Sequence, residues 1–198
     1  MTQKQIFSVW APLAAMWIMM AVELPFINEV IDRMANEEAN LAAFGVTFSL
    51  SLIIESPIIM LLSAGTSLPK DLYSYRKLLY FTHVLAGILT VTHILIALSP
   101  AYEYILINIM DAPESIVPLS RQSFIIMIPW SGAIAYRRMF QGILIKYMRT
   151  WIVPVTILSR LITGIAILSI GFSFTSISGA SLGAFSLSTG VVVAALSA

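Results

Sequence analysis

Residues 39–69 contain a single charged side chain, Glu55, in an otherwise uncharged and mostly apolar stretch. About 20 apolar residues span the hydrocarbon core of a bilayer, so this stretch is long enough to cross a membrane. An ionisable group near the bilayer centre costs roughly 2.5–3.5 kcal/mol on insertion scales, and it normally faces a protein interior or a water-filled path. Glu55 is therefore the first candidate for a functional residue.

The composition extends the membrane interpretation to the whole chain. Hydrophobic residues make up 59% of the sequence and charged residues 11%, with a mean hydropathy of +0.91, whereas soluble domains have about 25% charged residues. A soluble fold could not bury so much apolar surface. The net charge of +1 does not indicate a nucleic-acid partner. Cysteine is absent from the sequence, which excludes disulfides and thiolate metal sites.

Six apolar segments follow one another along the chain, joined by short polar linkers. They cover about residues 7–28, 41–66, 78–99, 118–136, 150–172 and 180–198. Each segment should be helical, because a backbone exposed to lipid must satisfy its own hydrogen bonds. The first lacks a small-residue cleavage site and is interpreted as an uncleaved span. We predict an all-α polytopic membrane protein with six transmembrane helices, in which residues 1–198 form a single transmembrane domain.

Basic residues concentrate at the N-terminus and in the second and fourth linkers, whereas acidic residues dominate the first and third. The basic residues concerned are Lys4, Lys70, Arg76, Lys77, Arg137, Arg138, Lys146 and Arg149. By the positive-inside rule, both termini are expected in the cytoplasm. This distribution predicts a multi-pass protein of the plasma or inner membrane, with bilayer lipid as its first partner.

The sixth segment is rich in small residues and serine and stops at Ala198 without a polar tail. Gly179 and Gly183 form a GxxxG step that favours close packing against another helix. Alternatively, a stripe that includes Ser181 and Ser186 could line a wet cavity. The abrupt end leads us to expect a second lobe, either as a further part of a longer chain or as a second copy of this one.

Four prolines lie inside predicted helices, at Pro25, Pro57, Pro129 and Pro154. Each removes an intrahelical hydrogen bond and tends to kink its helix. Carriers use such breaks as substrate sites and hinges, although kinks also occur in membrane helices without transport function.

Titratable residues within the predicted spans are few, and two interpretations compete for them. Glu55 and Arg160 both fall near mid-depth, where an ion pair could hold two helices in register. Alternatively, Glu55 or Glu23 exchanges a proton or cation, while Arg160 meets an anionic substrate. Asn28, close to Glu23, is a further candidate for substrate or ion binding.

Four residues are secondary candidates for the site. His93 is either an interior hydrogen-bonded histidine or a pH sensor. Arg137, Arg138 and Gln141 fall in the predicted fourth linker. Their cations either set topology and touch anionic headgroups, or edge a cytoplasmic vestibule that concentrates anions.

Motifs for catalysis are absent from the sequence: it has no HExxH, no phosphate-binding loop, no nucleophile elbow and no dinucleotide fingerprint. We predict no enzymatic activity, no metal site and no cofactor other than a coupling H⁺ or Na⁺.

Short stretches distributed over residues 10–150 carry a family likeness. They are Asn28 with Arg33, the LAAFG of residues 41–45, Ser56 with Pro57, the HILIA of residues 93–97 with Ser99 and Pro100, and the QGILIK of residues 141–146. Together they resemble the opening half of MATE-like transporters of the multidrug/oligosaccharidyl-lipid/polysaccharide exporter superfamily. The closest similarity is to the progressive ankylosis (ANK) branch.

The resemblance implies a twelve-helix transporter of two six-helix lobes that alternate access between the two sides of the membrane. This chain would be the N-terminal lobe. The ANK branch is associated with export of small anions, and MATE members with extrusion of organic cations against protons or sodium. Glu55 and Arg160 depart from the animal ANK pattern, which favours a different coupling or substrate.

The expected function is a secondary active exporter of a small organic or inorganic solute, coupled to a proton or cation. Glu23 and Glu55 are the candidate coupling carboxylates, and Arg160 is a candidate substrate or charge-balancing residue. A flippase for lipids or lipid-linked precursors would share the fold, with a lateral opening. A scaffold or channel subunit that does not transport would instead have a tightly packed lobe, with Glu55 neutralised by Arg160.

Overall fold

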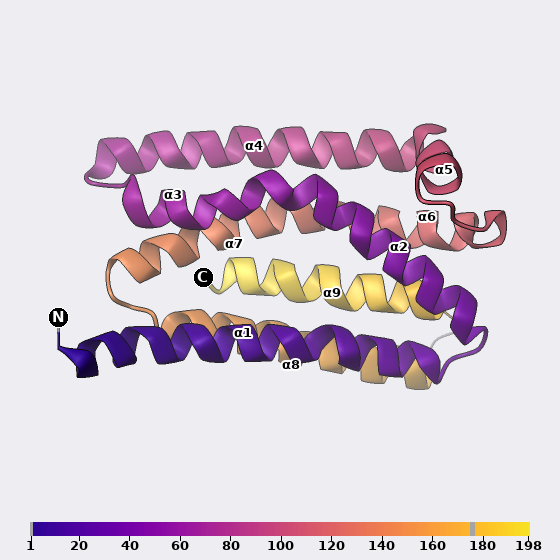
Figure 1. The fold of residues 1–198 in the computed structure, drawn as a ribbon, viewed down its shortest axis with the longest axis horizontal. Helices are drawn as coiled ribbons and strands as arrows, with labels where there is room; N and C mark the ends of the chain where they lie inside the picture. Colours follow the sequence, from indigo (N-terminus) through magenta and orange to yellow (C-terminus); the bar gives the residue numbers. More distant parts are fainter. Residues whose placement is uncertain (1, 175–176) are drawn as a thin grey trace.

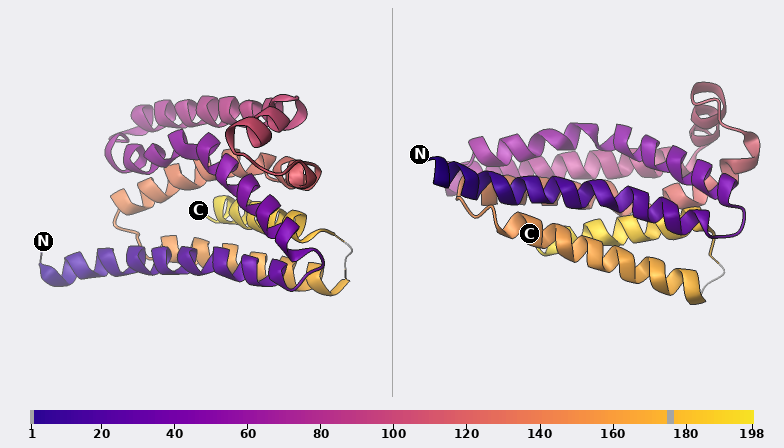
Figure 2. Two further views of the ribbon diagram at one scale, coloured as in Figure 1. Left: turned by 45° about the vertical axis from the view of Figure 1, so that its right-hand side comes forward. Right: turned by 60° about the horizontal axis from the view of Figure 1, so that its bottom comes forward.

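A computed structural model describes residues 2–174 and 177–198, and within these ranges the regular structure is helical throughout. Long helices lie side by side in a bundle (Figure 1; Figure 2). Thr175 and Ser176, which belong to the predicted fifth linker, lie outside the described residues. The predicted all-α class is therefore confirmed for the described part of the chain.

The helices are joined by short connections and run alternately along the bundle (Figure 1). In chain order they are α1 (Gln3–Asp32), α2 (Glu37–Glu55), the 3₁₀ segment η1 (Ser56–Met60), α3 (Leu61–Ser67), α4 (Leu72–Leu98), α5 (Ala101–Tyr104), the π-helical turn η2 (Ile105–Ile109), the 3₁₀ turn η3 (Glu114–Ile116), α6 (Val117–Ile126), α7 (Ile128–Lys146), α8 (Ile152–Phe174) and α9 (Gly179–Leu196). The acidic α1–α2 connection lies at one end of the bundle. The basic α3–α4 and α7–α8 connections lie with the N-terminus at the other.

Five helical stretches of the described chain are long and apolar enough to cross a membrane. They are Ile6–Asp32, Glu37–Ser67, Leu72–Leu98, Ile152–Ser173 and Gly179–Leu196. Large apolar side chains point outward along them, including Trp17, Ile53 and Leu95. This surface suits lipid, as expected of a membrane-embedded protein.

The fourth predicted segment, 118–136, has the wrong boundary and is not one continuous helix. α6 ends at Ile126, and α7 begins at Ile128 and continues to Lys146. Pro129 lies in the first turn of α7, where its missing N–H costs no intrahelical bond. Residues 137–146, predicted as linker, are therefore the second half of a helix.

Pro57 produces the second break in the bundle. It follows the end of α2 at Glu55 and lies in η1, which packs against α7. Pro25 stays inside α1, and Pro154 lies in the first turn of α8, so neither ends a helix. Of the four prolines, Pro57 and Pro129 mark the breaks, and the fold brings these two breaks together.

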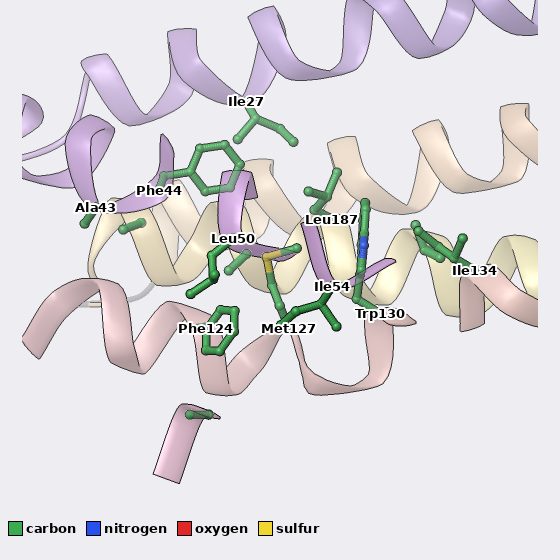
Figure 3. Close-up of a cluster of buried hydrophobic side chains, with 14 of the residues drawn as sticks. Ile27, Ala43, Phe44, Leu50, Ile54, Phe124, Met127, Trp130, Ile134 and Leu187 are labelled. Carbon is green, nitrogen blue, oxygen red and sulfur yellow. The ribbon is translucent and has the colours of Figure 1, made fainter. Parts of the chain in front are cut away.

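The core surrounds α9, which packs against α8, α7, α6, α2 and α1. A Cβ on Gly183 would lie 3.0 Å from Ile27 and 3.1 Å from Phe44, so glycine permits the close approach of α9 to α1 and α2. Figure 3 shows Ile27, Phe44, Leu187 and Trp130 in the same buried region. Ser181 and Ser186 are buried as well, which favours the packed-helix interpretation of α9 over a wet stripe.

Candidate functional site

Glu23 and Arg160 form a buried ion pair between α1 and α8. Arg160 Nη2 lies 2.5 Å from Glu23 Oε2, and Arg160 Nε donates to Glu23 Oε1 at 2.8 Å. Of the two interpretations that the sequence left open, the Glu55–Arg160 ion pair is therefore wrong. The reason is helix adjacency, because α8 packs along α1 and α9 and so presents Arg160 to Glu23. The charge-assisted hydrogen bond and the second close nitrogen–oxygen contact make this a strong type of side-chain interaction.

Glu55 is held in a different way. It ends α2 immediately before the Pro57 break, is 5% exposed, and accepts a hydrogen bond from Trp130 Nε1. Within the described residues it forms no ion pair. Trp130 follows the second break, in the first turn of α7. The two proline breaks thus position the carboxylate and its donor.

The structure places three predicted linker residues in α7, with their side chains buried in the bundle: Arg137, Arg138 and Gln141. The prediction that they contact headgroups or edge a cytoplasmic vestibule is therefore wrong. Arg137 is 1% exposed and Gln141 is fully buried. Trp130, Arg137 and Gln141 are seven and four residues apart, which places them on one helical stripe facing the interior.

Several buried polar atoms of α7 have no hydrogen-bond partner among the residues that the structure describes. They are Nε and Nη1 of Arg137, Nε of Arg138, both amide atoms of Gln141 and Oγ of Ser131. Neither arginine forms an ion pair within the described part of the chain. Buried polar groups in native proteins are normally hydrogen-bonded, so each exception needs an explanation.

We name Glu23, Glu55, Arg137, Arg138 and Arg160 the charged cluster. Arg137 lies within electrostatic range of the other four. Three cations and two carboxylates leave a net charge of +1 when all five are ionised. Because an uncompensated buried charge costs several kcal/mol, this surplus is expensive unless a ligand offsets it. The cluster can therefore attract an anion, and Glu55 offers a carboxylate that can take up a proton.

Asn28 and His93 lie apart from this arrangement. Asn28 is exposed on α1. His93 on α4 is buried, donates from Nε2 to the carbonyl oxygen of Phe124 at 3.0 Å, and stacks on the Phe124 ring. Within the described residues, neither forms a hydrogen bond or ion pair with the charged cluster.

A pocket of about 100 Å³ lies against Glu23 between α1, α8 and α9. Its walls include Val22, Phe26, Ile165 and Ser186. Val22, Phe26 and Ile165 are exposed on the outer surface of the bundle. The pocket thus leads from an apolar outer surface of α1 and α8 to the Glu23–Arg160 pair.

Sequence reasoning identified every ionisable member of the cluster but missed Trp130. One signal for it is present: an aromatic residue beside Pro129, deep in an apolar segment and away from the interfaces where tryptophan usually lies. Among the described residues, no group of three or more His, Asp or Glu side chains could hold a metal ion. Comparison with known proteins finds no family model, curated protein or solved structure that matches this chain.

Proposed function

We propose that this chain is one lobe of a proton-coupled secondary transporter for a small anionic solute. The observation that carries the proposal is the buried guanidinium of Arg137, which has unpaired donors and no ion-pair partner in the described chain. Guanidinium groups match carboxylate and phosphate oxygens in geometry and charge. Arg137 is the primary anion-binding residue of this proposal, and Arg138 and Gln141 supply further polar atoms.

Glu55 supplies the coupling. Protonation of its carboxylate removes one negative charge and raises the net charge of the cluster from +1 to +2. The more positive cluster then attracts an anion more strongly. By linkage, anion binding promotes protonation of Glu55 by the same factor. Proton and anion therefore bind together, and their release is also coupled.

The helix breaks at Pro57 and Pro129 supply the moving parts. Transporters place binding sites at discontinuous helices, because these combine freed backbone groups with hinges. Glu55 and Trp130 flank the two breaks, so a movement at either hinge changes the contact between them. Alternating access requires a second lobe, which we assign to a further part of a longer chain or to a second copy of this one.

The Glu23–Arg160 pair supports the transporter proposal over a scaffold. In a scaffold, Glu55 would be expected to be neutralised by Arg160, but Arg160 is engaged by Glu23. Glu55 therefore keeps a neutral donor as its partner and stays free to change its protonation state.

The test is anion-driven proton movement in liposomes that contain the full chain and a trapped pH-sensitive dye. Phosphate, citrate and chloride gradients serve as the driving solutes. Arg137→Gln should reduce the coupled flux by about 10–100-fold, because hydrogen bonds to charged groups contribute about 1.5–3 kcal/mol. Glu55→Gln should abolish proton movement while anion binding persists.

The matched control is Arg33→Gln, which removes an arginine that pairs with Glu29 on the exposed surface of α1. Flux through this variant should equal that of the native protein. Undiminished flux through Arg137→Gln, or no proton movement with any of the three anions, would contradict the proposal.

A second candidate, a lipid flippase, is favoured by the pocket beside Glu23, which opens toward the bilayer between α1 and α8. This function predicts movement of fluorescent lipid between the leaflets of the same liposomes. Replacement of Ile165 by tryptophan, which narrows the mouth of the pocket, should slow that movement. Lipid movement with no response to Ile165→Trp would exclude this route.

A further inference from the structure

Trp130 contacts one partner at the N–H edge of its indole and another over the ring face, and the two partners belong to different helices. Its indole Nε1 donates to the Glu55 carboxylate of α2. Over its face, the guanidinium carbon of Arg160 lies 5.4 Å from the ring centroid. Arg160 is in turn paired with Glu23 of α1. Trp130 therefore lies between the two carboxylates of the charged cluster.

The electrostatics of indole make this arrangement directional. The ring edge that carries the N–H is positive and the ring face is negative, so an anion at the edge and a cation at the face are both favourable. A carboxylate that accepts the N–H also polarises the ring and strengthens the attraction of the face for a cation, since chains of such contacts are cooperative. The contacts from Glu55 through Trp130 and Arg160 to Glu23 thus alternate in sign.

From this alternation we propose that Trp130 is a positioning residue that transmits the charge state of Glu55 to the Arg160–Glu23 pair. Loss of the charge on Glu55 weakens the hold of the ring on Arg160. Arg160 then interacts more closely with Glu23. The inference deepens the proposed transport function and rests on it for its biological meaning, but the coupling between the two carboxylates is a property of the protein alone.

Other charged groups around Glu55 do not explain such a coupling. Arg137 and Arg138 of α7 and Arg160 of α8 exert their fields on Glu55. Arginine stays protonated throughout the working range, so these groups do not change charge. Glu23 is the remaining titratable member of the cluster, and the side-chain contacts that link it to Glu55 run through Arg160 and Trp130.

A purely structural role for Trp130 is the alternative. The ring packs edge-on to Phe48 at a centroid distance of 6.2 Å and lies among Ile54, Leu187 and Ile134 in the core (Figure 3). Phenylalanine fills most of this space and presents a ring face, but it lacks the N–H. The substitution Trp130→Phe therefore separates packing from transmission.

The first experiment uses Trp130 as its own reporter, in purified protein without substrate. Trp10, Trp17 and Trp151 are exposed, and their replacement by phenylalanine leaves Trp130 as the single tryptophan. Its emission is measured from about pH 4 to 9, a range that covers carboxyl groups with raised or ordinary pKa values. We expect one transition, absent in Glu55→Gln.

The midpoint of this emission transition should also shift when Glu23 is replaced. Glu23→Gln is expected to shift the midpoint by about half a pH unit or more, a threefold change in the protonation equilibrium. Any of three results would overturn the inference: Trp130 emission that does not change with pH, a transition that is still present in Glu55→Gln, or a midpoint that is unchanged in Glu23→Gln.

The second experiment measures the pH profile of flux in liposomes. Trp130→Phe should flatten the profile, whereas Trp151→Phe, a change at an exposed site, should keep it. A native-like profile in Trp130→Phe would overturn the transmission and leave the transport proposal intact. If the native chain carries no flux, the transport proposal fails, and the fluorescence result still decides whether the carboxylates are coupled.

Discussion

Two buried polar regions of this bundle satisfy their polar atoms in opposite ways. In the hydroxyl region, buried side chains of α2 and α6 bond to backbone carbonyls of the same or the facing helix: Thr47 to Ser120, Ser51 to Thr47, Ser120 to Val117 and Ser123 to Leu119. In the charged cluster, side chains bond to side chains from other helices, and several donors have no partner within the described part of the chain.

The two regions differ in how strongly they depend on the positions of neighbouring helices. Ser51, Ser120 and Ser123 donate to carbonyl oxygens of their own helices, so a modest movement between helices leaves them satisfied. Thr47, which donates to the Ser120 carbonyl of α6, is the exception. A carboxylate that depends on a side chain of another helix loses its partner when the helices move. The charged cluster is therefore sensitive to the relative positions of α1, α2, α7 and α8, as the proposed transport function requires.

The largest expected effect is the loss of one partner from the buried ion pair. Glu23→Gln leaves the Arg160 charge buried and unpaired, which should lower the free energy of unfolding by about 3–5 kcal/mol. Reversible unfolding of the protein in mixed micelles measures the loss. The control is Glu29→Gln, which breaks the exposed pair with Arg33 and should cost at most about 1 kcal/mol. Equal losses would remove the distinction between buried and exposed pairs in this fold.

A smaller effect is expected where α7 crosses α3. Gly65 faces Gly142, and a Cβ at Gly65 would lie 2.6 Å from the carbonyl oxygen of Met139, so Gly65→Ala should force α3 and α7 apart. Overpacking of this kind typically costs about 1–3 kcal/mol. Because Arg138 and Gln141 lie on the same stretch of α7, the change should also reduce flux.

The matched control for this crossing is Gly87→Ala on α4, where a Cβ would meet nothing within 4 Å. There the better helix propensity of alanine should stabilise the protein by about 0.8–1 kcal/mol. Thermal unfolding of the two variants side by side gives the comparison. A destabilised Gly87→Ala together with a neutral Gly65→Ala would contradict this packing.

The hydroxyl region should respond less. Thr47→Val removes the bond from Thr47 Oγ1 to the Ser120 carbonyl oxygen, measured at 3.0 Å, while keeping the shape of the side chain. We expect a loss of about 1 kcal/mol, the typical net contribution of a neutral hydrogen bond, with flux and its pH profile preserved. A changed pH profile in this variant would extend the functional region beyond the charged cluster.

Sequence patterns could predict five of the six apolar segments, because hydropathy and length determine which stretches suit a bilayer. They also located Glu23, Glu55 and Arg160, since a charge inside such a stretch is conspicuous. The pairing could not be predicted in the same way. Depth along a helix follows from residue counting, but which helix is the neighbour depends on packing, and α8 packs beside α1.

The misassigned second half of α7 has a related cause. Two adjacent arginines and a glutamine resemble a polar linker when hydropathy is averaged over a window. Their burial depends on surrounding helices that are distant in sequence, namely α3, α4 and α9. Trp130 became a candidate only when the fold placed it between Glu55 and Arg160, because its position in the sequence carries no charge signal.

The smallest expected effect comes from Asp71, a carboxylate outside the membrane spans. It is exposed, whereas Glu55 is buried. Asp71 caps α4, where its Oδ1 accepts the backbone N–H of Ser74 at 2.7 Å and the Ser74 hydroxyl at 2.8 Å. The hydrogen bond from the Ser74 backbone lowers the pKa of the Asp71 carboxyl below its ordinary value. Its contribution to stability is therefore present at neutral pH and is lost as pH falls through the folded-state pKa.

Asp71→Ala should cause a small loss of stability at neutral pH, seen as a lower unfolding midpoint, and the difference from native protein should shrink in acid. Asp71→Asn keeps an oxygen acceptor without the charge, so its unfolding midpoint should lie between those of the native protein and Asp71→Ala. A difference that grows as the pH falls would reverse the sign and contradict the cap. Because this carboxylate is solvated and held by its own helix, Asp71→Ala should leave the pH profile of flux unchanged, whereas the buried Glu55 should set it.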